Sequence, residues 1–460
     1  MDQNHRATLL REHYATLQSF WESVLERTGY CAILLGAGHQ RFFFHDDQGP
    51  PFRPNPLMVQ WLAQEKISEN SWFIFSKDTD PILFFHQPDD FWHAATPAPE
   101  FLWDHLSLRV FSDLGALHTA LQGCLKQCKS GEGKIAQISE DSPAASEGCV
   151  INPPAVIHAL HFQRACKTEY ELTKMRQASI QGARGHRAAQ RAFSCGASEF
   201  EIHLAYLEAA GMNEWQLPYG NIIAQNHHAS LLHYQYQDRQ TGEHLNSLLI
   251  DAGANVDGYA SDITRTYIGP TCYSQAAADL FAELLERMQT HQDALIYQLV
   301  PGANYVDLQA AMHQSLARIL VDTGIVKCEP EEAFNSDLTV PFCPHGLGHL
   351  LGIQVHDVGG QQLDIDGQTN PPPEPYASLR LTRPLAEDMV ITVEPGLYFI
   401  PMLLEKKRAE GAPIDWRLVE LLIPFGGIRI EDNVRLLPKG AGVENLTRDA
   451  FANISESATP

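Results

Sequence analysis

Residues 250–267 read IDAGANVDGYASDITRTY, and the fold can first be predicted from this stretch. Asp257 and Gly258 stand between two segments of β-type residues, which is the strongest short-range signal for a hairpin with a two-residue turn. The cross-strand pairs that follow are Val256 with Tyr259, Gly253 with Asp262, and Asp251 with Thr264. Asp251 and Asp262 then become diagonal neighbours on one face of the ribbon. Like charges this close favour a bound cation or a shared proton. The alternative is two solvated acids on an exposed hairpin.

A second group of candidate residues is the histidine segment PHGLGHLLGIQVHDVGG at 344–360. His345 and His349 have the i,i+4 spacing of a helix, but three glycines at 346, 348 and 352 make a helix unfavourable. His356 follows His349 by an odd number of residues, so a bend must intervene if both side chains line one site. A lone histidine is usually structural, whereas three within twelve residues among glycines indicate a site.

Two glutamates interrupt apolar strand patterns further along the chain. Glu394 lies in VITVEPGLYF at 390–399, and Glu431 lies in GGIRIEDNVRL at 426–436. An acid inside an apolar strand requires a partner. Glu431 shares a strand face with Arg429 by two-residue alternation, so a structural ion pair is the simpler alternative for this residue.

Together the four acids and one imidazole form a set of hard donors that favours divalent manganese, cobalt or zinc. One metal ion would leave the site anionic. Two ions about 3.5–4 Å apart, bridged by carboxylates, would neutralise it and could share a hydroxide that attacks a polarised carbonyl. The sequence therefore predicts two divalent metal ions.

The length of 460 residues predicts two domains, because single hydrophobic cores stop growing below this size. A Pro- and Ser-containing stretch at 141–154 is the expected boundary, giving domains of residues 1–155 and 156–460. The first is expected to be a small α/β domain, with a helix near 9–25 and strands at 30–35, 72–75 and 82–85. The second is expected to be α+β with an antiparallel sheet. Its predicted helices lie near 275–299 and 306–322, and its predicted strands at 248–252, 259–268, 390–399 and 427–436. Ser/Thr-x-x-Glu patterns at 168–171 and 198–201 predict two helix starts.

The amino-acid composition narrows the range of possible functions. The formal charge of -23, from 33 basic and 56 acidic residues, disfavours nucleic acid and anionic membranes as partners. The N-terminus has no apolar signal core, and no stretch approaches the length of a membrane span. Nine cysteines without paired metal-type spacing suit a reducing compartment, so we expect a cytoplasmic protein.

The order of these motifs resembles the pita-bread metallopeptidases, which include prolidase and aminopeptidase P. The resemblance rests on two aspartates eleven residues apart, HGxGHxxGxxVHD, TVEPGLYF and GGIRIED, and it covers essentially the whole chain. The segments LPYGNIIAQNHHASLLHY at 217–234, DFWH at 90–93 and WRLVELLIPFGGIRIEDN at 416–433 are similar to bacterial Xaa-Pro dipeptidases, a subgroup that includes organophosphorus acid anhydrolases. The fold implied is a small N-terminal α/β domain followed by a pita-bread domain with a curved antiparallel sheet.

The resemblance also implies residue roles. The implied metal ligands are Asp251, Asp262, His349, Glu394 and Glu431, with Asp262 and Glu431 bridging. Glu394 would act as general base and acid, and His356 would contact the scissile carbonyl oxygen. His233 and Arg380 match positions that hold the substrate's C-terminal carboxylate, and His345 and Arg429 match supports behind the ligands. Tyr219 matches a residue of a small substrate pocket. Trp92 and Asp47 match residues that a neighbouring subunit's N-terminal domain contributes, which implies a homodimer.

The leading hypothesis is thus a prolidase with two manganese ions that cleaves dipeptides ending in proline. The resemblance also implies a side activity on phosphotriesters or phosphoryl fluorides. One alternative is aminopeptidase P, which removes a residue before proline from longer peptides. Another is a non-catalytic binding module, although such proteins typically lack metal ligands and all five are present here.

Overall fold

The computed structural model describes residues 3–64, 66–77, 79–99, 105–128, 133–140 and 148–456. The chain forms two compact units. Unit 1 comprises residues 1–164, 168–172 and 364–368, and unit 2 comprises residues 165–167, 173–363 and 369–460. Of the expected boundary at 141–154, residues 141–147 lie outside the described residues. Helix α4 (Pro154–Arg164) falls within unit 1, and the domain division at residue 155 stays a prediction.

Unit 1 contains a six-stranded mixed sheet in the order β4-β3-β2-β1-β5-β6. The predicted helix and three strands are confirmed, since α1, β1, β2 and β3 coincide with them. The central strand β1 is buried on both faces from Ala32 to Leu35, which explains its continuous apolar run. The strands are β1 (Tyr30–Gly36), β2 (Trp72–Ser76), β3 (Ile82–His86), β4 (Ser107–Phe111), β5 (Lys134–Ile138) and β6 (Cys149–Ile151), and the other helices are α1 (Gln3–Thr28), α2 (Pro56–Leu62) and α3 (Leu114–Cys128).

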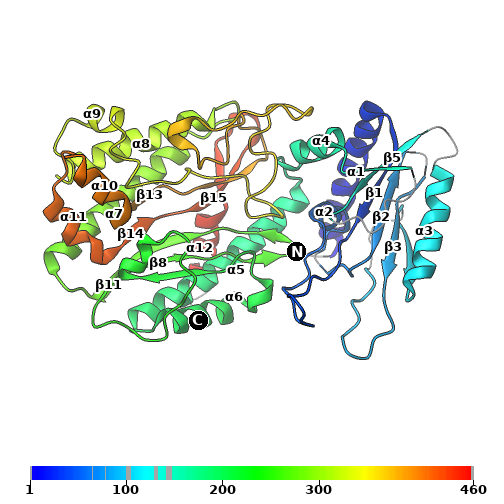
Figure 1. Ribbon diagram of the computed structural model, residues 1–460, viewed down its shortest axis with the longest axis horizontal. Helices are drawn as coiled ribbons and strands as arrows, with labels where there is room; N and C mark the ends of the chain where they lie inside the picture. Colours follow the sequence, from blue (N-terminus) through cyan, green and yellow to red (C-terminus); the bar gives the residue numbers. More distant parts are fainter. Residues whose placement is uncertain are drawn as a thin grey trace. The chain divides into compact units, whose positions relative to one another are not determined.

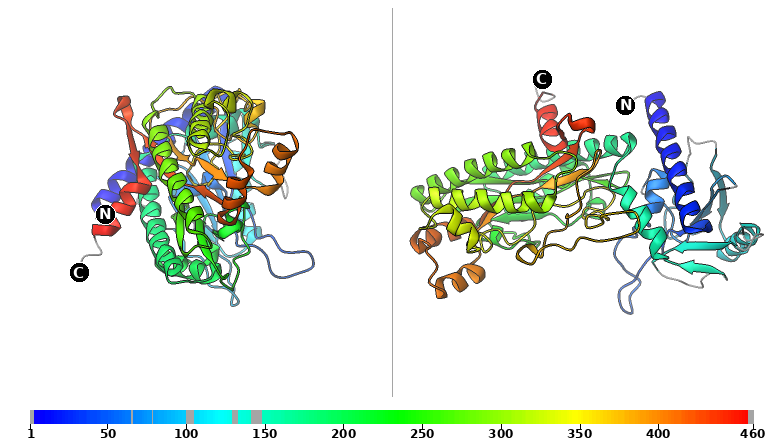
Figure 2. Two further views of the ribbon diagram at one scale, coloured as in Figure 1. Left: turned by 90° about the vertical axis from the view of Figure 1, so that its left-hand side faces the viewer. Right: turned by 90° about the horizontal axis from the view of Figure 1, so that it is seen from above.

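Unit 2 contains small antiparallel sheets packed with long helices, as the α+β prediction requires (Figure 1). Helices α7 and α8 pack against each other, and α7 also contacts β11 and β12 (Figures 1 and 2). The helices are α5 (Glu169–Ser194), α6 (Glu199–Ala210), α7 (Gln275–Tyr297), α8 (Tyr305–Asp322), α9 (Pro330–Asn335), α10 (Pro401–Ala409), α11 (Trp416–Leu422) and α12 (Leu446–Glu456). The strands are β7 (Ile222–Gln225), β8 (Leu245–Asp251), β9 (Asn255–Val256), β10 (Tyr259–Ala260), β11 (Thr264–Thr271), β12 (Val390–Val393), β13 (Gly396–Tyr398), β14 (Gly427–Arg429), β15 (Asp432–Leu436) and β16 (Val443–Asn445).

Three of the strands predicted for unit 2 are interrupted. The predicted strand 259–268 is divided into β10 and β11, 390–399 into β12 and β13, and 427–436 into β14 and β15. The breaks contain Asp262, Glu394 and Glu431 respectively. Pro395 has no backbone N–H to donate, which accounts for the second break. The three acids therefore lie where the hydrogen-bonded strand pairing is interrupted, outside the regular alternation of side chains on a sheet.

The two predicted helix starts are confirmed. Ser198 and Glu201 form a complete capping box at the start of α6, as predicted. Thr168 and Glu171 make the same pair of reciprocal contacts before α5. No helix in the described part of the chain combines the length and apolar character needed to span a membrane.

Candidate metal centre

The hairpin that carries the two aspartates has the predicted register. Val256 pairs with Tyr259 and Asp251 pairs with Thr264. Asp257 and Gly258 have φ angles of 53° and 93°, the positive values that a type I′ turn needs at both central positions. Asp251 ends β8 and Asp262 lies in the break before β11, so both carboxylates project from the same end of this ribbon.

Tyr219 joins these two acids. Its hydroxyl oxygen lies 2.7 Å from Oδ1 of Asp251 and 2.5 Å from Oδ1 of Asp262, so its single proton is shared between them. The ring packs over Gly253, where a Cβ atom would stand 2.8 Å from the ring and 2.0 Å from the carbonyl oxygen of Ser261. Burial and the two aspartate charges raise the pKa of Tyr219 well above its ordinary value, so the phenol stays protonated.

His349 approaches from the other side of the site. Its backbone exchanges hydrogen bonds with Thr392 of β12, through the Thr392 hydroxyl at 3.0 Å and the Thr392 N–H at 2.9 Å. Its Nδ1 lies 3.0 Å from the carbonyl oxygen of Leu350, which fixes the proton on Nδ1. Nε2 faces Oδ2 of Asp262 at 3.4 Å and Oε1 of Glu394 at 3.6 Å. Burial opposes a charge on His349, but the hydrogen bond to Asp262 and the charge of Glu394 outweigh it and raise the pKa of His349 above its ordinary value. When the ring is neutral, the Nε2 lone pair is available to a cation.

Glu394 and Glu431 complete the set. Glu431 lies opposite Thr264, whose hydroxyl donates to Oε2 of Glu431 at 2.7 Å. One ligand atom from each of Asp262, His349 and Glu431 lies within 4.8 Å of the other two. The structure therefore brings all five predicted ligands to one buried site, although their metal-binding roles stay a prediction.

Burial and neighbouring charges shift the pKa values of the acids at this site. Burial raises the pKa of Glu431 well above its ordinary value, and the charges of Asp262 and Glu394 raise it further. Burial, opposed by His349, raises the pKa of Glu394 to about 7. Burial alone would raise the pKa of Asp262 as well, but the hydrogen bond and charge of His349 outweigh burial and hold that pKa below its ordinary value.

The donor set fits two divalent cations better than the protein alone. Three buried carboxylates, the partly buried Glu394 and the buried imidazole of His349 lie together, and the guanidinium of Arg429 beside them neutralises only part of the negative charge. Oxygen donors with a single imidazole suit manganese, cobalt or zinc. Bound cations would offset the burial and the mutual repulsion that raise the pKa values of Glu431 and Glu394.

The two predicted supports lie behind the ligands. Arg429 donates from Nη2 to Oδ2 of Asp251 at 2.6 Å and from Nη1 to the hydroxyl of Tyr398 at 2.8 Å. His345 places its Nε2 2.9 Å from the same hydroxyl and its Nδ1 3.8 Å from Oε2 of Glu394. Tyr398 therefore links both supports. The sequence did not predict this role, although Tyr398 lies in the TVEPGLYF motif that carries the family resemblance.

The predicted substrate residues of unit 2 lie at the same site. The ring of His356 packs edge-on against His349, with centroids 4.5 Å apart and planes at 89°. Burial, with the charges of His349 and Arg380, lowers the pKa of His356 to about 4, so the ring is neutral near pH 7. The charge of His233 contributes to the lowered pKa values of both His356 and His345, so His233 lies near both rings. Both His233 and Arg380 are exposed and accessible to a ligand.

Trp92 and Asp47 belong to unit 1 and are both exposed, Trp92 at 78%. Trp92 donates its backbone N–H to Asp90, and Asp47 accepts from the side chain of Gln48. Neither contacts another predicted site residue through a hydrogen bond in the described structure. Their assignment to a neighbouring subunit's site stays a prediction.

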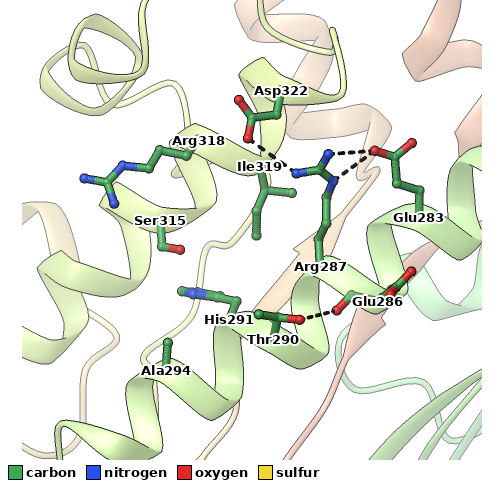
Figure 3. A pocket seen from close by; sticks show the side chains of 10 residues that line it. All are labelled: Glu283, Glu286, Arg287, Thr290, His291, Ala294, Ser315, Arg318, Ile319 and Asp322. Carbon is green, nitrogen blue, oxygen red and sulfur yellow. Dashed lines mark hydrogen bonds and ion pairs between the residues drawn. The ribbon is translucent and has the colours of Figure 1, made fainter.

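Two other features of unit 2 are separate from this centre. A cavity of about 530 Å³ lies between α7 and α8 and contains none of the predicted site residues (Figure 3). At its edge Arg287 bonds Glu283 and Asp322, and neither ring nitrogen of buried His291 has a hydrogen-bond partner. The second feature is a group of potential ligand atoms on Glu199, His228 and Asp238.

Comparison with known proteins identifies the family. Residues 173–437 match metallopeptidase family M24, and residues 8–162 match the N-terminal domain of Xaa-Pro dipeptidases. A protein named Xaa-Pro dipeptidase from Stenotrophomonas maltophilia is 39% identical over 455 residues, covering 98% of this chain and 99% of its own. One of the same name from Pectobacterium atrosepticum is 41% identical over 451 residues, covering 96% and 98%.

Solved structures agree on the fold. Aminopeptidase P from Escherichia coli, solved with the inhibitor Pro-Leu, superimposes with a TM-score of 0.71 at 22% identity, covering 98% of this chain and 99% of that one. The aminopeptidase PepP of Pseudomonas aeruginosa gives 0.71 at 21% identity with the same coverage. The predicted pita-bread fold with its N-terminal α/β domain is thereby confirmed. The chain belongs to metallopeptidase family M24 and carries the N-terminal domain of the Xaa-Pro dipeptidases.

Proposed function

We propose that this protein is an Xaa-Pro dipeptidase that hydrolyses dipeptides with C-terminal proline, using two divalent metal ions. The observation that carries the proposal is that four carboxylates, three of them buried and Glu394 partly buried, lie around Nε2 of the buried His349. The chain is also similar over nearly its whole length to proteins named Xaa-Pro dipeptidase.

Asp251, Asp262, His349, Glu394 and Glu431 would hold the two ions, with Asp262 and Glu431 shared between them. We propose manganese, because oxygen donors predominate, with cobalt or zinc as substitutes. When bound, the ions would polarise the scissile carbonyl and make a water molecule nucleophilic.

The remaining chemistry falls to side chains of unit 2. Glu394 would accept a proton from the attacking water at its carboxylate and return it to the proline nitrogen as the amide bond breaks. His356 is neutral, so its ring N–H can donate to the oxygen of the scissile carbonyl as negative charge develops there. Tyr219, whose hydroxyl contacts both Asp251 and Asp262, would border a small substrate pocket.

Dipeptide specificity would follow from how the far end of the substrate is held. A guanidinium at Arg380 and an imidazole at His233 would bind the free carboxylate of proline. A longer peptide has an amide and further residues at that position, so it would lose this charge pairing and meet a blocked pocket.

Aminopeptidase P activity is the second candidate, because proteins of that name share the fold. The deciding experiment measures hydrolysis of Ala-Pro and of Ala-Pro-Ala after chelation and again after manganese is restored. Manganese-dependent cleavage of Ala-Pro alone supports the dipeptidase. Cleavage of Ala-Pro-Ala favours aminopeptidase P, and no cleavage of either favours a binding module.

Three further properties are part of the proposal. A tetrahedral phosphorus centre resembles the intermediate of amide hydrolysis, so we expect a side activity on phosphotriesters and phosphoryl fluorides. Hydrolysis of a p-nitrophenyl phosphotriester no faster than in a metal-free control would exclude it.

We also propose a homodimer to which Trp92 and Asp47 contribute across subunits, and a cytoplasmic location, in keeping with nine free cysteines. Mixing Trp92→Ala and Glu394→Gln chains should restore part of the activity if the dimer shares its sites.

A further inference from the structure

His233 lies in a segment of irregular backbone that follows a short strand. The segment runs from Gln225, the last residue of β7, through a 3-10 turn at Asn226–Ser230 to Asp238. Apart from that turn it has no regular structure, so hydrogen bonds to its surroundings must fix its path. Because His233 is in this segment, the precision of that path decides where the imidazole stands.

One buried carboxylate ties the two ends of the segment together. The Oε1 atom of Glu199 accepts the backbone N–H of Gln225 at 2.7 Å, and Oε2 accepts the backbone N–H of Asp238 at 2.8 Å. Glu199 is the first residue of α6, and its side chain is 1% exposed. The next helix residue, Phe200, donates its backbone N–H to the carbonyl oxygen of Asp238 at 3.1 Å.

The same carboxylate also binds two side chains from within the segment. Nδ1 of His228 lies 2.8 Å from Oε1, and the hydroxyl of Tyr234 donates to Oε2 at 2.7 Å. The rings of His228 and Tyr234 stack on each other, with centroids 4.4 Å apart and planes at 18°. Tyr234 is the residue directly after His233, so this contact fixes the backbone next to the imidazole.

This arrangement argues against a second metal site at Glu199, His228 and Asp238. A carboxylate has about four lone-pair directions, and here four donors occupy them. A cation would have to displace the backbone N–H groups of Gln225 and Asp238 from this carboxylate. The cluster is complete as a hydrogen-bonded clasp of the protein's own groups.

We propose that Glu199 is a positioning residue for the reaction, which acts by holding the 225–238 segment so that His233 can bind the substrate's carboxylate. The inference rests on the proposed dipeptidase function and on the role of His233 within it. It adds a residue that touches neither substrate nor metal, yet determines how strongly the carboxylate is bound.

The test is Glu199→Gln, which keeps the shape but turns an NH₂ group toward two of the four donors. The KM for Ala-Pro should rise about tenfold, the factor expected when one ordinary hydrogen bond is lost at the binding site. The kcat should change less, and turnover of Ala-prolinamide, which has no carboxylate, should be unaffected. Glu201→Gln is the matched control, because Glu201 caps the same helix through Ser198 and does not touch the segment. Glu201→Gln should leave KM and kcat unchanged for both Ala-Pro and Ala-prolinamide.

A double-mutant cycle with His233→Ala separates positioning from general destabilisation. If Glu199 acts through His233, the tenfold effect disappears in the His233→Ala background. An effect that persists undiminished there, or a KM that rises equally for Ala-prolinamide, overturns the proposal. Tyr234→Phe removes one of the four donors without changing charge, and it should give a smaller change in the same direction even if Glu199→Gln folds poorly.

A structural readout keeps this test distinct from that of the proposed function. Hydrogen exchange should show faster exchange of the Gln225 and Asp238 amides in Glu199→Gln than in Glu201→Gln. If the wild-type protein cleaves no Xaa-Pro dipeptide, the proposed function fails on its own, and unchanged protection of these two amides would overturn the clasp as well.

Discussion

Glu394 and Glu431 occupy opposing positions in one antiparallel register. Val393 pairs with Asp432 on one side of them and Gly396 pairs with Arg429 on the other, so the count across the break sets the two glutamates opposite each other. Opposed like charges destabilise a ladder. Here the ladder is interrupted at this pair, and the two carboxylates face the site that also holds His349 and Asp262.

The first prediction concerns Glu431→Gln. The substitution removes a shared ligand, so manganese content should fall and kcat/KM for Ala-Pro should drop by more than about 100-fold, beyond the usual cost of losing a residue behind a ligand. The metal-free variant should nevertheless melt higher than metal-free wild type, by about 2–4 °C, because burying Glu431 among other acids costs either its charge or the uptake of a proton, and glutamine requires neither. Metal analysis and thermal unfolding with and without chelator measure both effects.

The matched control for that experiment is Asp257→Asn. It also removes one negative charge from the same part of unit 2, but in the hairpin turn, where asparagine accepts the positive φ. Metal content and activity should stay at the wild-type level. A metal-free Glu431→Gln protein that is less stable than wild type would contradict the idea that repulsion dominates this site.

The second prediction is a pH dependence of the metal-free protein. Burial raises the pKa of Glu394 from 4.5 to about 7, so between these pH values the folded state keeps a proton that the unfolded state releases. The contribution of Glu394 to the free energy of unfolding should therefore be largest below pH 4.5 and should fall as pH rises to about 7. The lowered pKa of Asp262 acts in the opposite sense only below about pH 3.8, outside this window.

Urea unfolding at several pH values checks this trend. Glu394→Gln should lack the decline between pH 4.5 and 7. Saturating manganese should reverse its sign, because ligand deprotonation then favours the folded, metal-bound state as pH rises. Histidines such as His356, with a pKa lowered to about 4, act in the opposite sense over the same window, so the quantity to compare is the difference in stability between wild type and Glu394→Gln. A difference that stays constant from pH 4.5 to 7 would show that Glu394 is ionised at lower pH than its burial implies.

Much of this site could be predicted from local sequence, and the limit is clear from particular residues. The turn residues Asp257 and Gly258 define the hairpin register, which is why the pairing of Asp251 with Thr264 was predictable. The strand breaks could not be predicted in the same way. The apolar alternation continues through Glu431, and only Pro395 signals the break beside Glu394.

Long-range contacts were beyond the sequence for a different reason. Glu199 reads as part of a helix start, and nothing in its neighbourhood in sequence indicates that it would bind both ends of a segment 26 and 39 residues away. Tyr398 likewise reads as a core aromatic residue of a strand. Such roles depend on which side chains tertiary packing brings together, and local periodicity carries no information about that.

The third prediction concerns Arg380. Arg380→Ala should raise KM for Ala-Pro by about 10- to 100-fold, the range for losing a hydrogen-bonded charge pair. Arg380→Lys should recover part of this, because it keeps the charge but not the planar pair of donors. Kinetics on Ala-prolinamide should differ little among the three proteins. An exposed arginine remote from the site, Arg318 on α8, gives the control Arg318→Ala, and an equal rise in KM for the amide would argue against a carboxylate contact.

The fourth prediction concerns Gln292, a fully buried residue of α7. Its side-chain amide donates to the carbonyl oxygen of Val393 at 2.9 Å and to that of Ile430 at 3.1 Å. These carbonyls belong to the residues directly before Glu394 and Glu431. The oxygen of the same amide accepts from Arg448 at 3.0 Å, so the amide itself is held in place. One side chain thus holds both sides of the strand break that presents the two glutamates.

Gln292→Leu has nearly the same volume but leaves both carbonyl oxygens without this donor. Manganese affinity should fall about 10- to 100-fold, the range observed when a group behind a ligand is lost, and the protein should also unfold more easily. Titration calorimetry of the metal-free protein measures the affinity without relying on activity. Gln298→Leu, at the exposed C-cap of the same helix, should change neither quantity. If Gln292→Leu lowers stability but binds manganese as tightly as wild type, the amide supports the fold only, and the spacing of Glu394 and Glu431 must be fixed by the ladders on either side of the break.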